Sequence, residues 1–468
     1  MKSDRLLVTI IALFLFNTVR ATEATKPEIF PSATWSRQGE FLIDTILDPW
    51  SQYNPSVAFD GTNYLVAWEN EIGRHTRAAR VSPDGKVLDH PPIALVSGWQ
   101  SAVNVNPTVA FDGTNYLVVF MDLNYMCTPT VEGMRVSTDG IVIDSFGSFG
   151  IAFTTTPPSI AFDGNNYLVL WSGWPPEGVY GTRVTPGGVV LGSFVVATDY
   201  AEQYPSVAFD GTNYFAVWQC SRNDSGDIYG ARVSPAGIVL DPSGIAISTA
   251  IDSQRLPTVA FDGTDYLVVW QDRRNGPEYD IYGTRVSPSG TVLDPAGIAI
   301  STATGNQCAP SVAFDGNNCV IAWEDERSGI SSDIYGAIMN TSGMIIDTFA
   351  VSIQLGDQIT PALAHGPGDQ ILVTYSGWTD SINGQPVNTM RIWGKFYPFV
   401  GIEQGEARIV KQQSYGATIF RGPLHLPEGE KCKVFDITGR AVEPDKIQPG
   451  IYFIEVDGIV VQKIVKVR

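Results

Sequence analysis

The sequence is poor in the residues that build metal centres, disulfide frameworks and membrane spans. Its 468 residues include five cysteines and four histidines, with no Cys-x-x-Cys pair. This scarcity argues against a zinc site and against a fold that depends on disulfides. The most apolar stretch, Leu6 to Phe16, is too short to cross a bilayer as a helix.

Positive charge is also scarce, since 30 Lys and Arg stand against 49 Asp and Glu. Residues 36–400 hold 37 acidic and 16 basic side chains, whereas residues 401–468 hold 9 and 10. A strongly acidic body repels phosphate backbones and anionic lipid headgroups. We therefore expect neither nucleic acid nor a membrane surface as a partner.

The N-terminus has the features of an export signal. Lys2 and Arg5 precede the apolar stretch, and Val19-Arg20-Ala21 offers a cleavage site with a small final residue. We predict a signal peptide over residues 1–21 and a linker over 22–35, with an uncleaved anchor as the alternative. The expected location is outside the cell, either secreted or at the cell surface.

One segment, "PSVAFDGTNYLVAW" at residues 55–68, is repeated along the chain. Close copies begin at Pro107, Pro158, Pro205, Pro257 and Pro310, and a diverged copy, "PALAHGPGDQILVTY", begins at Pro361. The seven opening prolines are 52, 51, 47, 52, 53 and 51 residues apart. A fixed period near fifty residues indicates a propeller or a solenoid.

Each unit predicts four short strands. The proline is expected to open a hairpin of two strands, a third run such as "DIYGTRVSP" (residues 280–288) follows, and a fourth such as "TVLDPAGIAIS" (residues 291–301) ends the unit. The second strand is apolar on both faces, as expected where blades stack on each side. Asp-Pro pairs in the fourth run should blunt an exposed edge. Cys319 stands where most units have Tyr, which indicates a packing role, too far from Cys308 for a disulfide.

The two ends of the repeat region complement each other. The seventh unit lacks a fourth strand, and residues 39–55 resemble residues 187–205, a fourth strand with its crossover. We therefore predict an all-β fold, a seven-bladed β-propeller over residues 36–400 that the N-terminal strand closes into a ring.

The Asp-Gly-Thr-Asn segments suit the turn between the two inner strands. An alternative is that their aspartates bind calcium. No other metal or cofactor is expected.

Residues 401–468 lack the period and show short alternating runs, "KVFDITGRAV" and "GIYFIEVDGIVVQKIVKVR", which predict a small β-sandwich. The order "VFDITGRAV", "QPGIYFIEVDG" and "KIVKVR" resembles the C-terminal sorting domain of the bacterial type IX secretion system. The resemblance implies export through the type IX secretion machinery. The alternative is an immunoglobulin-like accessory domain. The repeats themselves resemble those of uncharacterised bacterial secreted β-propeller proteins, a likeness that carries no activity.

Function is expected where the repeats differ. One face of the propeller should carry short uniform turns and the other long individual loops, where binding residues concentrate. These loops hold aromatic residues that offer surfaces for sugars or for a protein partner. We predict as ligand-binding residues Trp99, Tyr125, Trp174, Tyr200, Tyr279 and Trp378. The alternative is that these rings pack beneath neighbouring loops.

The same loops are rich in carboxylates: Asp122, Asp224, Asp272, Glu324, Asp325 and Glu326. A glycosidase would need two of them across a cleft, but arginines in the same loops, such as Arg274 and Arg327, explain the charges equally well as ion pairs. We favour a monomeric binding protein for an extracellular glycan or protein. The alternatives are a carbohydrate-active enzyme (glycosidase or lyase) with carboxylates at the channel mouth, and a structural adhesin-like surface protein.

Overall fold

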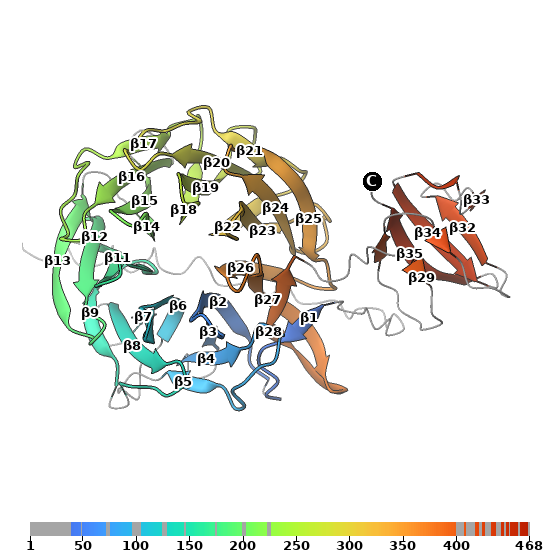
Figure 1. Ribbon diagram of the computed structural model, residues 1–468, viewed down its shortest axis with the longest axis horizontal. Coiled ribbons are helices and arrows are strands. Elements are labelled where there is room, and N and C mark those ends of the chain that lie inside the picture. Colours follow the sequence, from blue (N-terminus) through green and yellow to red (C-terminus); the bar gives the residue numbers. More distant parts are fainter. Residues whose placement is uncertain are drawn as a thin grey trace, which may run out of the picture.

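The computed structural model describes residues 39–398 with gaps at 48, 72–74, 96–103, 124–128, 145–146, 174–175, 199–202 and 222–225, and the segments 407–408, 417–420, 424–425, 432–436, 441–443, 446–448, 450–456 and 459–466. Across 39–398 the regular elements are strands, and no helix able to span a membrane occurs in the described parts. Seven four-stranded antiparallel sheets stand in a ring (Figure 1). The predicted seven-bladed β-propeller is confirmed.

The two inner strands of each blade come from the repeated segment. The innermost strands are β2 (Gln52–Phe59), β6 (Asn104–Phe111), β10 (Ser159–Phe162), β14 (Gln203–Phe209), β18 (Gln254–Phe261), β22 (Gln307–Phe314) and β26 (Gln358–His365). The second strands are β3 (Tyr64–Asn70), β7 (Asn115–Asp122), β11 (Tyr167–Gly173), β15 (Tyr214–Cys220), β19 (Tyr266–Asp272), β23 (Asn318–Asp325) and β27 (Ile371–Ile382).

The third and fourth strands complete each blade toward the rim. The third strands are β4 (His75–Val81), β8 (Thr130–Ser137), β12 (Gly178–Val184), β16 (Asp227–Val233), β20 (Asp280–Val286), β24 (Asp333–Asn340) and β28 (Gln385–Tyr397). The fourth are β5 (Ile93–Leu95), β9 (Phe149–Phe153), β13 (Val190–Ala197), β17 (Ile245–Ser248), β21 (Ile298–Ser301), β25 (Ile345–Ser352) and, for the last blade, β1 (Glu40–Leu42).

The core lies between blades. One cluster joins Phe215 and Val217 of β15 to Tyr266 and Trp270 of β19 in the next blade, and the other blade junctions are built alike. Each second strand is buried on both faces, as its apolar sequence predicts. Cys319 is buried in the equivalent cluster, in the place of a tyrosine, which confirms the packing role expected for it.

The ring closes as predicted. β1 pairs antiparallel with β28. These are the first and last strands of the propeller in the sequence, and they lie side by side in Figure 1 in blue and orange. Phe41 of β1 stacks on Phe396 of β28 at 5.5 Å between ring centroids. An amide of β28 donates to the Gln52 side chain of the first blade, which joins the first and last blades directly.

The repeated proline does not open its strand as expected. Five of the seven innermost strands begin three residues before it and β14 begins two residues before it, whereas β10 begins just after it. In all of them except β10 the pairing register shifts at the proline, which marks a β-bulge. A bulge leaves one residue unpaired, so it tolerates a proline that has no N–H to donate.

The run predicted to form the fourth strand is a strand only in part. In "TVLDPAGIAIS" only Ile298–Ser301 form a strand, preceded by a single bridge between Val286 and Val292. The Asp-Pro pair lies in the turn between them. Asp294 does not blunt a strand edge, because both its oxygens accept hydrogen bonds from the Arg285 side chain on the third strand.

The described parts of the C-terminal region form a five-stranded sheet in the order β30-β35-β34-β32-β33, and a separate two-stranded pair, β29 with β31. The strands are β29 (Ala407–Arg408), β30 (Ala417–Phe420), β31 (Leu424–His425), β32 (Cys432–Asp436), β33 (Ala441–Val442), β34 (Gly450–Val456) and β35 (Ile459–Lys466). The β-sandwich and its sorting role stay predictions.

Candidate functional site

The two faces of the propeller differ in the segments they carry. Because strands alternate in direction, the turns that link first to second and third to fourth strands lie on one face, here named the turn face. The loops between second and third strands and the crossovers between blades lie on the opposite face, named the loop face. The chain enters β1 and leaves β28 on the turn face.

On the turn face, aspartate side chains accept hydrogen bonds from backbone N–H groups of the turns in which they lie. In the hairpin turns one aspartate oxygen accepts two backbone N–H bonds of 2.6–2.8 Å, at Asp60, Asp112, Asp163, Asp210, Asp262 and Asp315. This geometry is that of an Asx-turn, which explains why the residue recurs. In the described parts of the chain, no three His, Cys, Asp or Glu side chains are grouped to hold a metal ion.

The central channel opens on the loop face in a cavity of about 360 Å³. Its lining is neutral and includes the seven repeated prolines, with Asn54, Ser56, Asn106, Thr108 and Thr360 as the polar members from the inner strands. No carboxylate belongs to this described lining.

The bulges tie neighbouring blades together around this cavity. The residue before the proline has a positive φ of 48–53° in six blades. In three of them its N–H donates to a side chain on the second strand of the preceding blade. Leu256 donates to Gln219, Ala309 to Gln271 and Thr360 to Glu324, at 3.3, 3.2 and 2.7 Å. These bonds link blades 4 to 5, 5 to 6 and 6 to 7.

Glu324 places a carboxylate where the two preceding blades have glutamine. Burial raises its pKa to about 7, and the nearby charges of Glu326 and Asp357 act in the same direction. The hydrogen bond from Thr360 opposes this shift only in part.

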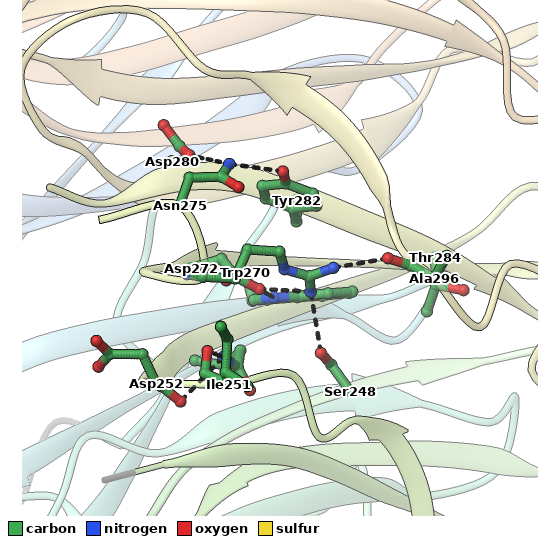
Figure 2. Close-up of polar contacts among 12 residues, drawn as sticks. Ser248, Ile251, Asp252, Trp270, Asp272, Asn275, Asp280, Tyr282, Thr284 and Ala296 are labelled. Carbon is green, nitrogen blue, oxygen red and sulfur yellow. Dashed lines mark hydrogen bonds and ion pairs between the residues drawn. The ribbon is translucent and has the colours of Figure 1, made fainter. Parts of the chain in front are cut away.

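Two other predicted carboxylates are structural. Asp272 accepts a hydrogen bond from the Trp270 indole at 2.7 Å (Figure 2). It also forms an ion pair with Arg274 at 2.7 Å. Arg274 in turn lies 4.1 Å over the Tyr282 ring. Blade 6 repeats the set with Trp323, Asp325, Arg327 and Tyr335. For Asp272 and Asp325 the structure therefore supports the alternative of ion pairs with loop arginines.

A second cavity, of about 250 Å³, lies on the loop face of blade 5. The β19–β20 loop lines it with residues 275–278, β20 contributes Asp280, and the crossover to β22 contributes residues 302–304. Asp280 begins β20 and is 7% exposed. Asn275 donates to one of its carboxylate oxygens and to the Tyr282 hydroxyl (Figure 2). Sequence reasoning missed this site, although the Asp-Ile-Tyr-Gly motif at 227, 280 and 333 was a signal for it.

Of the predicted ligand-binding aromatics, Trp99, Tyr125, Trp174 and Tyr200 lie outside the described residues. Tyr279 is 9% exposed and lies beneath Arg273, whose guanidinium carbon is 4.2 Å from the ring centroid. Trp378 is partly exposed, packs on Gly356 and donates its indole N–H to Asp380 at 2.7 Å. The two described rings come from different blades, Tyr279 from blade 5 and Trp378 from blade 7.

Comparisons with known proteins add no functional evidence. No protein family and no curated protein matches the chain. Among solved structures, an α-L-arabinofuranosidase from Lactobacillus brevis is 11% identical, with a TM-score of 0.34, over 52% of this chain and 93% of that one. A subtype N11 neuraminidase-like protein of A/flat-faced bat/Peru/033/2010 (H18N11) is 10% identical, with a TM-score of 0.41, over 76% of this chain and 93% of that one. An acylaminoacyl peptidase from Pyrococcus horikoshii is 12% identical, with a TM-score of 0.42, over 76% and 53%. Similarity this low says nothing about activity.

Proposed function

We propose that this chain is an exported β-propeller binding protein that holds an extracellular glycan or protein on its loop face. The observation that carries the proposal is the contrast between the two faces. The turn face repeats one turn from blade to blade, whose aspartate hydrogen-bonds the backbone of the same turn. The loop face has a different loop in each blade and holds both described cavities. Variable loops on a rigid scaffold are the usual place of a binding site.

The path of the chain supports the same face. Because β1 begins and β28 ends on the turn face, the connections of the propeller to the rest of the chain leave from that side. The loop face therefore lies opposite the points at which the chain enters and leaves the propeller.

The distribution of carboxylates favours binding over catalysis. A glycosidase needs two acidic groups that face each other across the substrate. In the described residues Asp272 and Asp325 are each occupied by an indole and an arginine, and the channel mouth has a neutral lining. A carbohydrate-active enzyme and a structural adhesin-like protein are the two rivals of this proposal.

A glycan array and a pull-down with defined extracellular proteins test the proposal. We expect the full chain to bind a ligand, and Trp378→Ala and Trp174→Ala each to weaken it by about fivefold or more if these rings are anchors. Ile141→Ala, which removes an exposed apolar side chain near the turn face, is the control and should leave the affinity unchanged. Turnover of a glycan would establish the enzyme instead, and no ligand at all would favour the structural role.

We also propose that residues 1–21 direct export and that residues 401–468 are a type IX sorting domain. The support is the order of motifs in the sequence. A reporter carrying a signal peptide and residues 401–468 should reach the surface or the medium of a host with type IX machinery. The same reporter without residues 401–468 is the control. If both reporters stay in the periplasm, the C-terminal region is an accessory domain only.

A further inference from the structure

The cavity on blade 5 has an acidic lining that the propeller does not neutralise. Asp280 is buried to more than nine tenths, and of its two carboxylate oxygens only one, Oδ2, has a hydrogen-bond partner in the described part of the chain, the Asn275 amide at 2.7 Å. In Figure 2 the other oxygen turns away from every residue drawn. Asp280 lines the cavity, so this unpartnered oxygen is available to a ligand.

The neighbouring arginines form no ion pair with Asp280 in the described residues and balance its charge only in part. Arg274 is committed to Asp272 at 2.7 Å, to the Ala296 carbonyl at 2.6 Å and to the Tyr282 ring. Arg273 lies over Tyr279. Burial raises the pKa of Asp280, and the charges of Asp272 and Glu278 act in the same direction, whereas the Asn275 hydrogen bond and the Arg274 charge oppose the shift. A buried carboxylate without a cation is costly, and a cation entering from solvent removes that cost.

Glu278 adds a second carboxylate to the cavity. It is exposed, and one of its oxygens accepts the Gly305 backbone N–H at 2.9 Å, which holds the side chain against the crossover that forms the opposite wall. Thr302 and Thr304 of that crossover also line the cavity. The cavity thus combines two carboxylates with hydroxyl-bearing side chains.

The surface around the cavity favours a cationic ligand over a neutral or acidic one. Asp252, Glu326 and Asp357 are exposed on the loop face of the adjoining blades, and the chain carries a net charge of −19. This field attracts positive groups and repels acidic glycans. A neutral sugar would leave the Asp280 charge unbalanced.

We propose that the blade 5 cavity is a subsite for the ammonium group of a lysine side chain, or the guanidinium of an arginine, presented by a protein ligand. The inference deepens the proposed function and rests on it, because it identifies the ligand of the loop face as a basic protein segment. Asp280 receives the cation at the bottom of the cavity and Glu278 at its rim. The aliphatic part of the side chain lies between the β19–β20 loop and the crossover.

Fluorescence anisotropy with a labelled decapeptide containing three lysines in a Gly-Ser background tests the proposal on the full chain. We expect the acetyl-lysine version of the peptide to bind at least about tenfold more weakly. Asp280→Asn should weaken binding of the lysine peptide about tenfold, and Glu278→Gln about threefold. Asp347→Asn, which removes an exposed carboxylate from outer strand β25, is the matched control and should change the affinity less than twofold.

A second variant fills the cavity. Thr304→Lys places an ammonium group at the rim of the cavity, so it should abolish peptide binding and raise the melting temperature. The proposal is wrong if the lysine and acetyl-lysine peptides bind alike, or if Asp280→Asn and Asp347→Asn weaken binding equally. A loop-face ligand that needs Trp378 but binds Asp280→Asn with unchanged affinity overturns this inference and leaves the proposed function standing.

Discussion

The residue that follows the buried aromatic of the second strand shows how a single position joins two blades. In blades 4 and 5 it is Gln219 and Gln271, and each accepts a backbone N–H from the bulge of the next blade. In blade 6 it is Glu324, which makes the shortest of the three bonds, at 2.7 Å. A neutral amide performs this role without charge, so the carboxylate brings a desolvation cost that the other two blades avoid.

Glu324→Gln is therefore expected to stabilise the propeller at alkaline pH. The pKa of Glu324 is raised from 4.5 to about 7, so the folded state holds a proton that the unfolded chain releases between these values. The contribution of Glu324 to the stability of the natural protein consequently falls as pH rises from 4.5 to 7. The gain from Glu324→Gln should be near zero at pH 4 and reach on the order of 3 kcal/mol well above pH 7. Thermal melting across this range measures it.

Gln271→Glu is the reciprocal variant in blade 5. It should destabilise the protein at pH 8 and much less at pH 4, because it introduces the same buried charge at the equivalent bulge. A gain from Glu324→Gln that is constant with pH would show that the carboxylate is not the source of the cost.

At the scale of the element, each blade is held by short polar devices that repeat with the sequence. The hairpin aspartate accepts the backbone N–H bonds of the turn between the first and second strands. An arginine of the third strand donates hydrogen bonds to the aspartate that follows the turn after that strand, as Arg232 donates to Asp241. In most blades the arginine also reaches a carbonyl of the following blade, as Arg80 reaches Thr138. These devices explain why Asp-Gly, Arg-Val-Ser-Pro and Leu-Asp recur together.

One pair of variants distinguishes two roles of the hairpin aspartate, stabilising the turn and binding calcium. Asp112 accepts the N–H groups of Thr114 and Asn115, both at 2.7 Å. Asp112→Ala removes both bonds and should cost about 1 to 2 kcal/mol of unfolding free energy. Asp112→Asn keeps an acceptor oxygen and should cost less than half as much.

Denaturant unfolding with and without a calcium chelator measures both variants. If the aspartates bound calcium, Asp112→Asn would be as damaging as Asp112→Ala, and chelation would lower the stability of the natural protein. We expect no effect of the chelator on the natural protein or on either variant.

At the scale of the whole molecule, ring closure makes the first and last blades depend on each other. Three residue pairs join β1 to β28, from Glu40 opposite Lys395 to Leu42 opposite Trp393. Arg391 donates to the Trp50 carbonyl across the same junction. A propeller that is closed by strand pairing has no free blade edge from which to unzip.

Deletion of residues 36–48 removes β1 and should expose one edge of the last blade. The expected loss of stability is several times the ~0.5 kcal/mol typical of surface changes, because it removes a pairing strand and the Phe41 contact with Phe396 together. Replacement of residues 328–331, an exposed loop, by two glycines is the control. Equal melting temperatures for the deletion and the natural protein would contradict closure by β1.

The sequence alone determined the architecture, because each repeat carries its own strand pattern and turn chemistry. Apolar second strands recur in all seven units and Asp-Gly turns in six of them, and the fourth strand that the seventh unit lacks is matched by residues 39–55. The seven-bladed ring and its N-terminal closure followed from these properties. The roles of Asp272 and Asp325 stayed open at that stage, since ion pairing and catalysis use the same residue types.

The tertiary structure decided what depends on neighbours in space. The bulge at each proline needs a partner strand to define it, and the pKa of Glu324 depends on burial between two blades. The Asp280 cavity forms only where the β19–β20 loop meets a crossover some 25 residues further along the chain. Linear spacing cannot place such groups because the distance between two loops is set by blade packing and not by the chain between them.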